Sequence, residues 1–275
     1  MGVWQWSPRE HRFEEPTSDI SSWTLVAADS WFVKDRRVRA FDRHRARFAH
    51  AAAEVGIGEA VTDDFWAAMV EKIPATGEWF PRVDVLENSP VRARVVAFRM
   101  RQAPKRTQEL RVLIPPYSDP RNSPGRKGPD IALLSRLAAE AIEDHDCGEL
   151  LLLSEDGYVI EGATTSLPWW VGETLHVPDP KLGALPGVTS AVILDEAREL
   201  SIPIEYHRTR SEDLAEHEVW LVNALHGIRR AKEFVNGRTD ERHLVRQLAA
   251  KADVESVQLD RWRDWLDSIS VPRGA

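Results

Sequence analysis

Short segments in the first 115 residues carry the alternating or β-branched pattern of strands. Trp31-Phe32-Val33 and Val38-Arg39-Ala40 flank a polar turn at 34–37, which predicts a β-hairpin. Helical spacing of apolar residues follows the hairpin, first after Asp42 up to Gly56 and again from Thr62 to just before Pro74. Three more strands are expected, at 79–85, 92–100 and 109–114. The first half is therefore predicted to be an α+β unit.

The second half alternates helical and strand patterns in a different order. It begins with an apolar helical stripe from Ile131 to Ile142, and a helix is also expected after Pro186. The turn residues at 154–157 separate two strand-like runs, which predicts another hairpin. The strands expected here are 149–153, 158–160, 166–171, 174–177, 204–208 and 218–222, and the closing helices 241–250 and 259–269.

A loop rich in Pro, Ser, Gly and basic residues divides the two halves at 115–129. Such a composition is typical of a connection between units. We therefore expect a small α+β domain at 1–118, an interdomain loop at 119–128 and a larger domain at 129–275.

Composition excludes several classes of protein. The 275 residues are 43% hydrophobic and 29% charged, as in a soluble globular protein, and no apolar run is long enough to span a bilayer. A cytoplasmic location is expected. A net charge of −8 argues against nucleic-acid binding, despite the basic run from Lys34 to Arg47. The single Cys147 cannot form an intrachain disulfide, and no metal-binding motif is present, so no catalytic metal is predicted.

Four motifs in order suggest a chemistry. Lys127 lies in the Pro/Gly-rich loop, and Glu161 follows it by 34 positions at the end of a predicted hairpin. The other motifs are His44-Arg45-Ala46-Arg47-Phe48, Leu185-Pro186-Gly187-Val188-Thr189 and the segment from Glu218 to Leu225. Together these segments resemble the fold-type IV pyridoxal-phosphate enzymes, which include branched-chain aminotransferases, D-amino acid aminotransferases and aminodeoxychorismate lyases. The resemblance covers roughly residues 28 to 230.

The resemblance implies a fold and an assembly. It implies a two-domain α+β protein, in which a small N-terminal α/β domain precedes a larger domain whose β-barrel-like sheet is flanked by helices. Relatives of this type are homodimers, so we expect a homodimer here.

The resemblance also assigns residues to the cofactor, pyridoxal 5′-phosphate. Lys127 is expected to form a Schiff base with it and to carry the substrate proton, a role that a desolvated amine can fill. Glu161 is expected to hold the pyridine nitrogen in its protonated form. A phosphate group needs unpaired N–H donors at a helix start and a cationic fork. Gly187-Val188-Thr189 and Arg47 are expected to supply these, while Leu185 packs against the ring and Ala224 lies on the phosphate side.

Three positions depart from the branched-chain aminotransferase pattern. Ala132 stands where those enzymes have tyrosine, Ser166 where they have asparagine, and Ala224 where they have threonine. Asn223-Ala224-Leu225 instead looks like the segment of aminodeoxychorismate lyases. These differences affect the choice of substrate and reaction more than the binding of the cofactor.

Three functions follow in order of preference. The first is an aminotransferase that moves an amino group between an amino acid and a 2-oxo acid, both small molecules. The second is a lyase that uses the same cofactor and releases pyruvate from aminodeoxychorismate. The third is a binding protein without catalysis on the same fold. For a substrate carboxylate, the candidate residues are Arg82, Arg92, Arg94 and Arg99, although alternating arginines are also common on a solvated sheet face.

Overall fold

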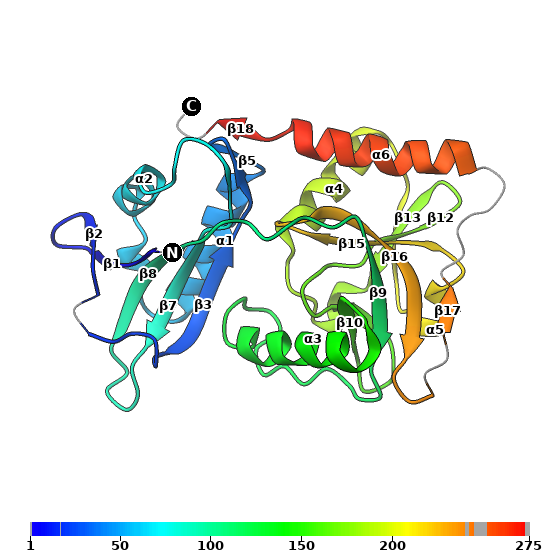
Figure 1. Cartoon of the computed structure of the whole chain (residues 1–275), viewed down its shortest axis with the longest axis horizontal. Coiled ribbons are helices and arrows are strands. Elements are labelled where there is room, and N and C mark those ends of the chain that lie inside the picture. Colours follow the sequence, from blue (N-terminus) through cyan, green and yellow to red (C-terminus); the bar gives the residue numbers. More distant parts are fainter. Residues whose placement is uncertain (1, 17, 240–241, 245–251, 273–275) are drawn as a thin grey trace. The chain divides into compact units, whose positions relative to one another are not determined.

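A computed structural model describes residues 2–16, 18–239, 242–244 and 252–272 of the chain (Figure 1). Contacts divide the chain into two units. Unit 1 comprises Met1–Arg106, Arg126–Pro129 and Ile269–Ala275, and unit 2 comprises Thr107–Gly125 and Asp130–Ser268. The chain therefore passes from unit 2 to unit 1 and back within the segment that contains Lys127.

Unit 1 is an antiparallel sheet packed against two helices. The sheet has the strand order β2-β1-β8-β7-β3, and β4, β5, β6 and β18 form a smaller sheet. The strands are β1 (Gly2–Ser7), β2 (Arg12–Glu14), β3 (Thr24–Ser30), β4 (Val33–Lys34), β5 (Arg37–Val38), β6 (Glu78–Trp79), β7 (Arg82–Glu87), β8 (Arg94–Met100) and β18 (Val271–Pro272). The helices are α1 (Phe41–Glu54), the short η1 (Gly58–Ala60) and α2 (Asp63–Glu71).

Local chemistry explains these elements. Asp35 and Arg36 both have positive φ in the two-residue turn between β4 and β5, the backbone that matches the twist of a hairpin. Thr62 accepts a hydrogen bond from the backbone N–H of Phe65 and so caps α2. Phe48 of α1 and Phe65 of α2 are fully buried in an aromatic core against the sheet.

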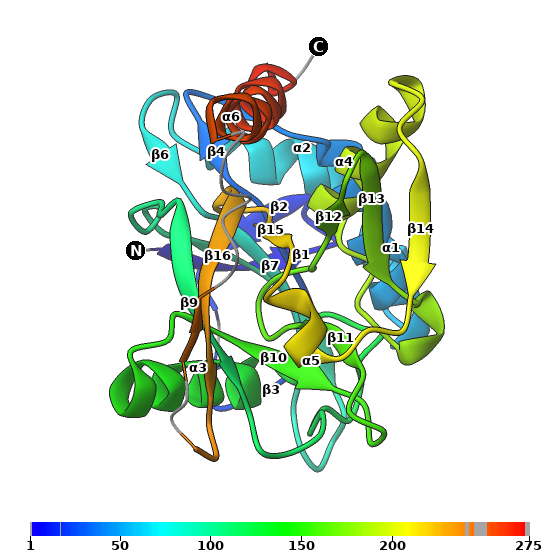
Figure 2. The ribbon, with the colours of Figure 1, turned by 90° about the vertical axis from the view of Figure 1, so that its right-hand side faces the viewer.

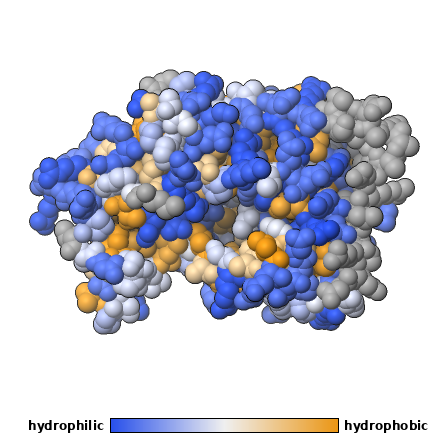
Figure 3. All heavy atoms as spheres, in the orientation of Figure 1, coloured by the Kyte–Doolittle hydropathy of each residue, from blue (hydrophilic) through white to orange (hydrophobic). Residues whose placement is uncertain are grey.

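The other face of the unit 1 sheet is covered only in part. Ile20, Leu86 and Ala97 are buried there, and Val3, Trp23, Leu25 and Val95 pack around them while remaining partly exposed. Figure 3 shows apolar residues gathered over this sheet. This face is therefore less polar than a typical solvated sheet face.

Unit 2 is built on a curled sheet with helices packed against it. The sheet follows the order β11-β10-β9-β16-β15-β12-β13-β14, and β17 pairs with β16. Figure 2 shows β13 and β14 side by side at one edge. The strands are β9 (Glu109–Ile114), β10 (Glu149–Leu153), β11 (Val159–Gly162), β12 (Trp169–Val171), β13 (Thr174–Pro178), β14 (Ile204–His207), β15 (Glu218–Asn223), β16 (Gly227–Asn236) and β17 (Arg242–Leu244). The helices are α3 (Ile131–His145), η2 (Pro180–Leu182), α4 (Val188–Glu199), α5 (Ser211–Leu214) and α6 (Ala252–Ser268).

The structure confirms most predicted elements and adds short ones that were not predicted, among them β1, β2 and α5. It differs further at three places. Strand β9, which the sequence pattern placed in the first domain, belongs to unit 2 because it pairs in parallel with β10 and β16. Strand β16 was not predicted, since its Arg229 and Glu233 are charged yet buried. The helix expected at 241–250 lies mostly outside the described residues, and 242–244 within it form β17 instead.

Within the described residues, no helix combines the length and apolar character that crossing a membrane requires.

Candidate active site

The backbone of Lys127 is fixed against strand β3 in unit 1. The N–H of Ala28 donates a hydrogen bond of 2.7 Å to the carbonyl oxygen of Lys127. At the next residue, Gly128 has φ 144°, and a Cβ there would lie 2.6 Å from the Cα of Ala27. Only glycine permits this close approach. Any other residue would bring a Cβ into contact with Ala27 and would also have to adopt a backbone conformation that side chains disfavour. The position of Lys127 is thus set by its neighbour and by β3.

A buried carboxylate on the same strand organises the His44 motif. Asp29 has no exposed surface, and its Oδ1 lies 2.9 Å from Nδ1 of His44. Arg47 donates to both oxygens, with Nε 2.7 Å from Oδ2 and Nη2 2.8 Å from Oδ1. Burial opposes ionisation of Asp29, but the charges and hydrogen bonds of Arg47 and His44 outweigh it and hold the pKa of Asp29 well below its usual range.

His44 connects this cluster electrostatically with Lys127. Burial lowers the pKa of the His44 imidazole, Asp29 opposes this, and the positive charges of Arg47 and Lys127 lower the pKa further. A neutral imidazole is therefore favoured at pH 7. In unit 1 the structure thus brings together Arg47 and His44 around Asp29, and Lys127 lies close enough to His44 to affect its pKa. Two atoms of the Arg47 fork are bound to the Asp29 carboxylate.

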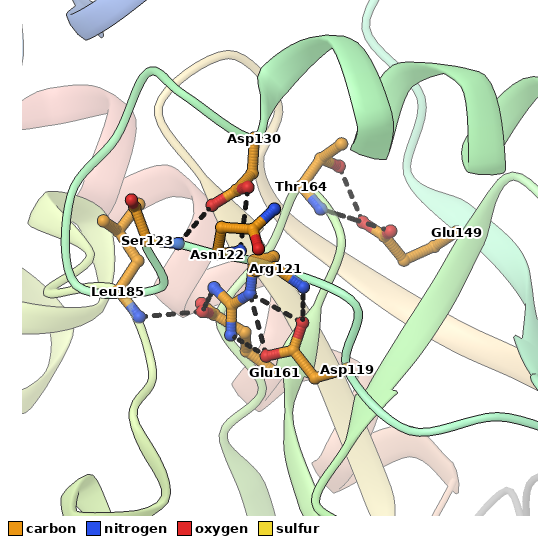
Figure 4. A network of polar contacts seen from close by, with 9 residues as sticks. All are labelled: Asp119, Arg121, Asn122, Ser123, Asp130, Glu149, Glu161, Thr164 and Leu185. Carbon is orange, nitrogen blue, oxygen red and sulfur yellow. Dashed lines mark hydrogen bonds and ion pairs between the residues drawn. The ribbon is translucent and has the colours of Figure 1, made fainter.

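Glu161 is held at the end of β11 in unit 2 by two donors that reach the same oxygen. Both donate to Oε1: Nη1 of Arg121 lies 2.6 Å from this oxygen, and the backbone nitrogen of Leu185 lies 2.7 Å from it (Figure 4). No hydrogen bond from the described residues reaches Oε2. Burial raises the pKa of Glu161 to about 7, even though Arg121 and the Leu185 N–H lower it.

Arg121 is itself fixed by a second acid. Its Nε and Nη2 donate to the Asp119 carboxylate at distances of 2.7 to 3.0 Å. These partners outweigh the burial of Arg121 and raise its pKa, so the guanidinium stays charged. The carboxylate of Asp130, just before α3, accepts the backbone N–H groups of Asn122 and Ser123 (Figure 4). The loop that carries Arg121 is therefore tied down at both ends.

A third buried acid shapes the turn after Glu161. Glu149 accepts the hydroxyl groups of Thr164, at 2.6 Å, and of Thr165, at 3.0 Å. A Cβ at Gly162 would lie 2.4 Å from the Oγ1 of Thr165, so the turn closes tightly on glycine. Glu149 thus fixes the course of the chain from Glu161 toward Ser166.

The start of helix α4 lies against that segment. Gly187 is the N-cap residue, and no side chain caps the helix. Because the first N–H groups of a helix have no acceptor within the helix, those of α4 have neither an intrahelical acceptor nor a capping side chain. A Cβ at Gly187 would lie 2.4 Å from the Oγ of Ser166. Val188 and Thr189 are buried in the first turn, and Leu185 is half-buried just before it. Uncapped N–H groups at a helix start are the kind of donors that bind anions, and the Ser166 hydroxyl lies close to Gly187.

The end of β15 lies beside the same segment. Ser166 and Val222 exchange two backbone hydrogen bonds of 3.0 Å, and Nδ2 of Asn223 lies 3.3 Å from the carbonyl oxygen of Thr164. Ala224, half-buried, follows in the turn to β16. Unit 2 therefore brings together Glu161, Leu185, the start of α4 and the Asn223-Ala224 segment.

Sequence reasoning missed Asp29, Asp119 and Arg121. Asp29 interrupts an otherwise apolar strand, and an acid at such a position usually has a buried cationic partner, so a signal was present. Asp119 and Arg121 lie in a loop whose composition gave no sign of burial. The pairing of Arg121 with Glu161 joins residues 40 positions apart and follows only from the fold.

The arrangement in unit 2 fits the cofactor that the sequence motifs imply. Oε2 of Glu161 receives no hydrogen bond from the described residues and can accept one from a protonated ring nitrogen. The first N–H groups of α4, which no side chain caps, can donate to an anion. An acid and an anion site on adjoining segments are the two contacts that a phosphorylated pyridine requires.

The chain matches a known family over most of its length. The profile of the family described as "Amino-transferase class IV" matches residues 27–234. A curated relative, the aminodeoxychorismate lyase of Bacillus subtilis (strain 168), is 31% identical over 78 residues. That match covers 28% of this chain and only 27% of the relative's length.

Solved structures share the fold at low sequence identity. A branched-chain aminotransferase from Thermoproteus uzoniensis, solved with norvaline, superposes with a TM-score of 0.73 at 17% identity and covers 99% of both chains. A hypothetical aminotransferase from Mycobacterium tuberculosis in its PLP-bound form has a TM-score of 0.69 at 17% identity, covering 95% of this chain and 98% of that one. At such identities the likeness shows a common fold.

Proposed function

Because the chain belongs to the class IV aminotransferase family, we propose that it is a pyridoxal-phosphate aminotransferase acting through Lys127. Its reaction moves an amino group between an amino acid and a 2-oxo acid. The observation that carries this proposal is the state of Glu161, whose Oε1 is saturated by Arg121 and Leu185 while Oε2 is left for the cofactor.

Each residue has a defined task in this proposal. The cofactor supplies an electron sink for the bond broken at the substrate's α carbon. Lys127 forms the covalent link through Nζ and afterwards moves the α proton as a base. Glu161 keeps a proton on the ring nitrogen. The first N–H groups of α4, from Val188 and Thr189, hold the phosphate, and Leu185 packs on the ring.

Arg47 has an indirect part in the proposal. Its fork is engaged by Asp29, and this bidentate pair fixes the guanidinium at one orientation. We propose Arg47 as a cofactor-binding residue because it matches the family motif, although the carboxylate of Asp29 balances its charge in this pair. We propose Ala224 as a residue on the phosphate side. Neutral His44 contacts Oδ1 of Asp29, the oxygen that Nη2 of Arg47 also reaches.

A lyase is the second candidate, and one observation favours it. The curated relative that matches is an aminodeoxychorismate lyase, and Asn223-Ala224-Leu225 resembles the segment of such enzymes. In this reading the same residues bind the cofactor and remove the proton, and pyruvate is the product released.

Spectroscopy of the purified protein separates these functions. An amino acid donor should remove the visible absorption band of the bound cofactor, and a 2-oxo acid should restore it, if the protein is an aminotransferase. Release of pyruvate from aminodeoxychorismate without a 2-oxo acid would identify the lyase. A protein that binds no cofactor would contradict both.

We also propose that the chain forms a homodimer. The partly exposed Val3, Trp23, Leu25 and Val95 on the open face of the unit 1 sheet support an apolar contact with a second copy. Light scattering coupled to gel filtration tests this proposal, and a monomer at micromolar concentration would contradict it.

A further inference from the structure

Two histidines and a glutamate meet on unit 2 at a place that the proposed function does not use. His176 lies on β13, and Glu205 and His207 lie on β14. Their ligand atoms all lie within 4.8 Å of one another. We propose that these three side chains form a binding site for a divalent transition-metal ion, with Zn²⁺ as its best occupant.

The register of the two strands places the three side chains on one face. Strands β13 and β14 are parallel, with His176 opposite Glu205 and Pro178 opposite His207. Side chains two residues apart in a strand point to the same face, so His207 projects beside Glu205 and toward His176. The cluster is therefore built by strand pairing and does not depend on a loop.

Without a metal ion, the three side chains contact one another directly. Nε2 of His207 lies 2.9 Å from Oε2 of Glu205, and the two imidazole rings are 4.7 Å apart with an interplanar angle of 31°. A metal ion would take the place of the hydrogen atom between Nε2 of His207 and Oε2 of Glu205. The neutral imidazole would bind the ion through Nε2 and carry its proton on Nδ1. The donor atoms around tetrahedral zinc lie about 3.3 Å apart, so a modest closing movement is enough.

One of the three ligands is buried and the other two are exposed. His176 is 9% exposed and is packed by Trp169, whose ring centroid lies 5.7 Å from its own. Glu205 and His207 are exposed, so their side chains can adjust to an ion without repacking the core. One fixed imidazole and two adjustable ligands leave the fourth position to water or a small ligand.

The donor set selects the class of metal. Two imidazole nitrogens and one carboxylate suit zinc and its neighbours, whereas Mg²⁺ and Ca²⁺ prefer oxygen ligands. Strand β14 ends the strand order of the sheet, and β13 is its neighbour there. An ion at this site would link β14 to β13 through side chains and hold the edge strand in place.

Calorimetric titration of the tag-free holoprotein with Zn²⁺ tests the site. We expect one ion per chain with a dissociation constant below about 10 μM, and no saturable binding of Mg²⁺. His176→Ala, His207→Ala and Glu205→Gln should each weaken Zn²⁺ binding at least tenfold. His50→Ala is the matched control, because His50 also lies beside a glutamate, Glu54, but has no third ligand among the residues that the structure describes.

Two outcomes would overturn the proposal. One is the absence of saturable Zn²⁺ binding, and the other is binding that His176→Ala and His207→Ala leave unchanged. A second measurement guards against misfolded variants. Zn²⁺ should raise the unfolding temperature of the unchanged protein and not that of His207→Ala, whose side chain is exposed. Neither result depends on the activity of the cofactor site.

Discussion

Nη1 of Arg121 and Oε1 of Glu161 lie 2.6 Å apart, and both side chains are almost completely buried. This ion pair turns the glutamate so that one oxygen is saturated and the other is left without a donor from the described residues. The pair joins the loop after β9 to the end of β11. It therefore serves both the stability of unit 2 and the orientation of the acid that we assign to the cofactor.

Removal of the Arg121 charge should destabilise the protein strongly. Arg121→Ala leaves Asp119 buried without its cation and Glu161 without its hydrogen-bond donor, and we expect a loss of about 3 kcal/mol in the free energy of unfolding. Urea denaturation measures this loss. Arg136→Ala, which removes an exposed pair with Glu140 on α3, should cost less than about 0.5 kcal/mol. Equal effects of the two substitutions would contradict the role given to Arg121.

The raised pKa of Glu161 predicts how stability depends on pH. The folded, cofactor-free chain keeps this proton up to about pH 7, whereas an ordinary glutamate releases it near 4.5. Folding therefore takes up a proton between these values, and stability falls as the pH rises through that window, by up to about 3 kcal/mol.

Comparison with Glu161→Gln isolates this contribution. Denaturation of both cofactor-free proteins at several values between pH 4.5 and 7 should show a slope for the unchanged chain that is reduced in the variant. Identical slopes would mean that Glu161 is ionised across the whole range.

Close packing at the start of α4 predicts a reversible defect. Gly187→Ala would push a methyl group against the Oγ of Ser166, and we expect cofactor affinity to fall about tenfold, or about 1.4 kcal/mol. In the double variant with Ser166→Ala the nearest remaining contacts are 3.5 Å or longer, so most of the affinity should return. Affinity that stays low in the double variant would show that the steric explanation is wrong.

Gly128 controls the position of Lys127, and its substitution should affect cofactor loading. Gly128→Ala would place Cβ 2.6 Å from the backbone of Ala27 and displace the neighbouring lysine. We expect the fraction of protein with bound cofactor to drop sharply in absorbance measurements. Gly172→Ala is the control, since Gly172 also has positive φ but a Cβ there meets nothing within 4 Å. Normal loading of the Gly128 variant would contradict this role.

The sequence predicted the elements better than the division of the chain. Hydrophobic periodicity identified α1, α2, α3, α4 and most strands because each buries one face against a core. It could not place β9, because its partners β10 and β16 lie far along the chain. Strand β16 was missed because it contains charged residues, which do not look like a buried strand in the sequence. In the structure its Glu233 pairs with Arg111 of β9 at 2.7 Å, and this partner makes burial of the charge possible.

The sequence predicted only those residues of the candidate site that belong to a family motif. The motifs pointed to Lys127, Glu161, Arg47 and the segment from Leu185 to Thr189, and the structure places Glu161 and the α4 start on adjoining segments of unit 2. Asp29 contacts Arg47, and Arg121 contacts both Asp119 and Glu161. The contacts of Asp29 with Arg47 and of Arg121 with Glu161 depend on tertiary pairing. Such partners leave no fixed spacing in the sequence.

The central claim is that Lys127 binds pyridoxal phosphate covalently. Reduction of the purified protein with borohydride, followed by digestion and mass spectrometry, tests this most directly. We predict that the reduced cofactor is found on the peptide containing Lys127, that Lys127→Ala abolishes it, and that Lys181→Ala, at an exposed lysine, leaves it intact. A cofactor attached to another lysine, or none attached at all, would contradict the claim.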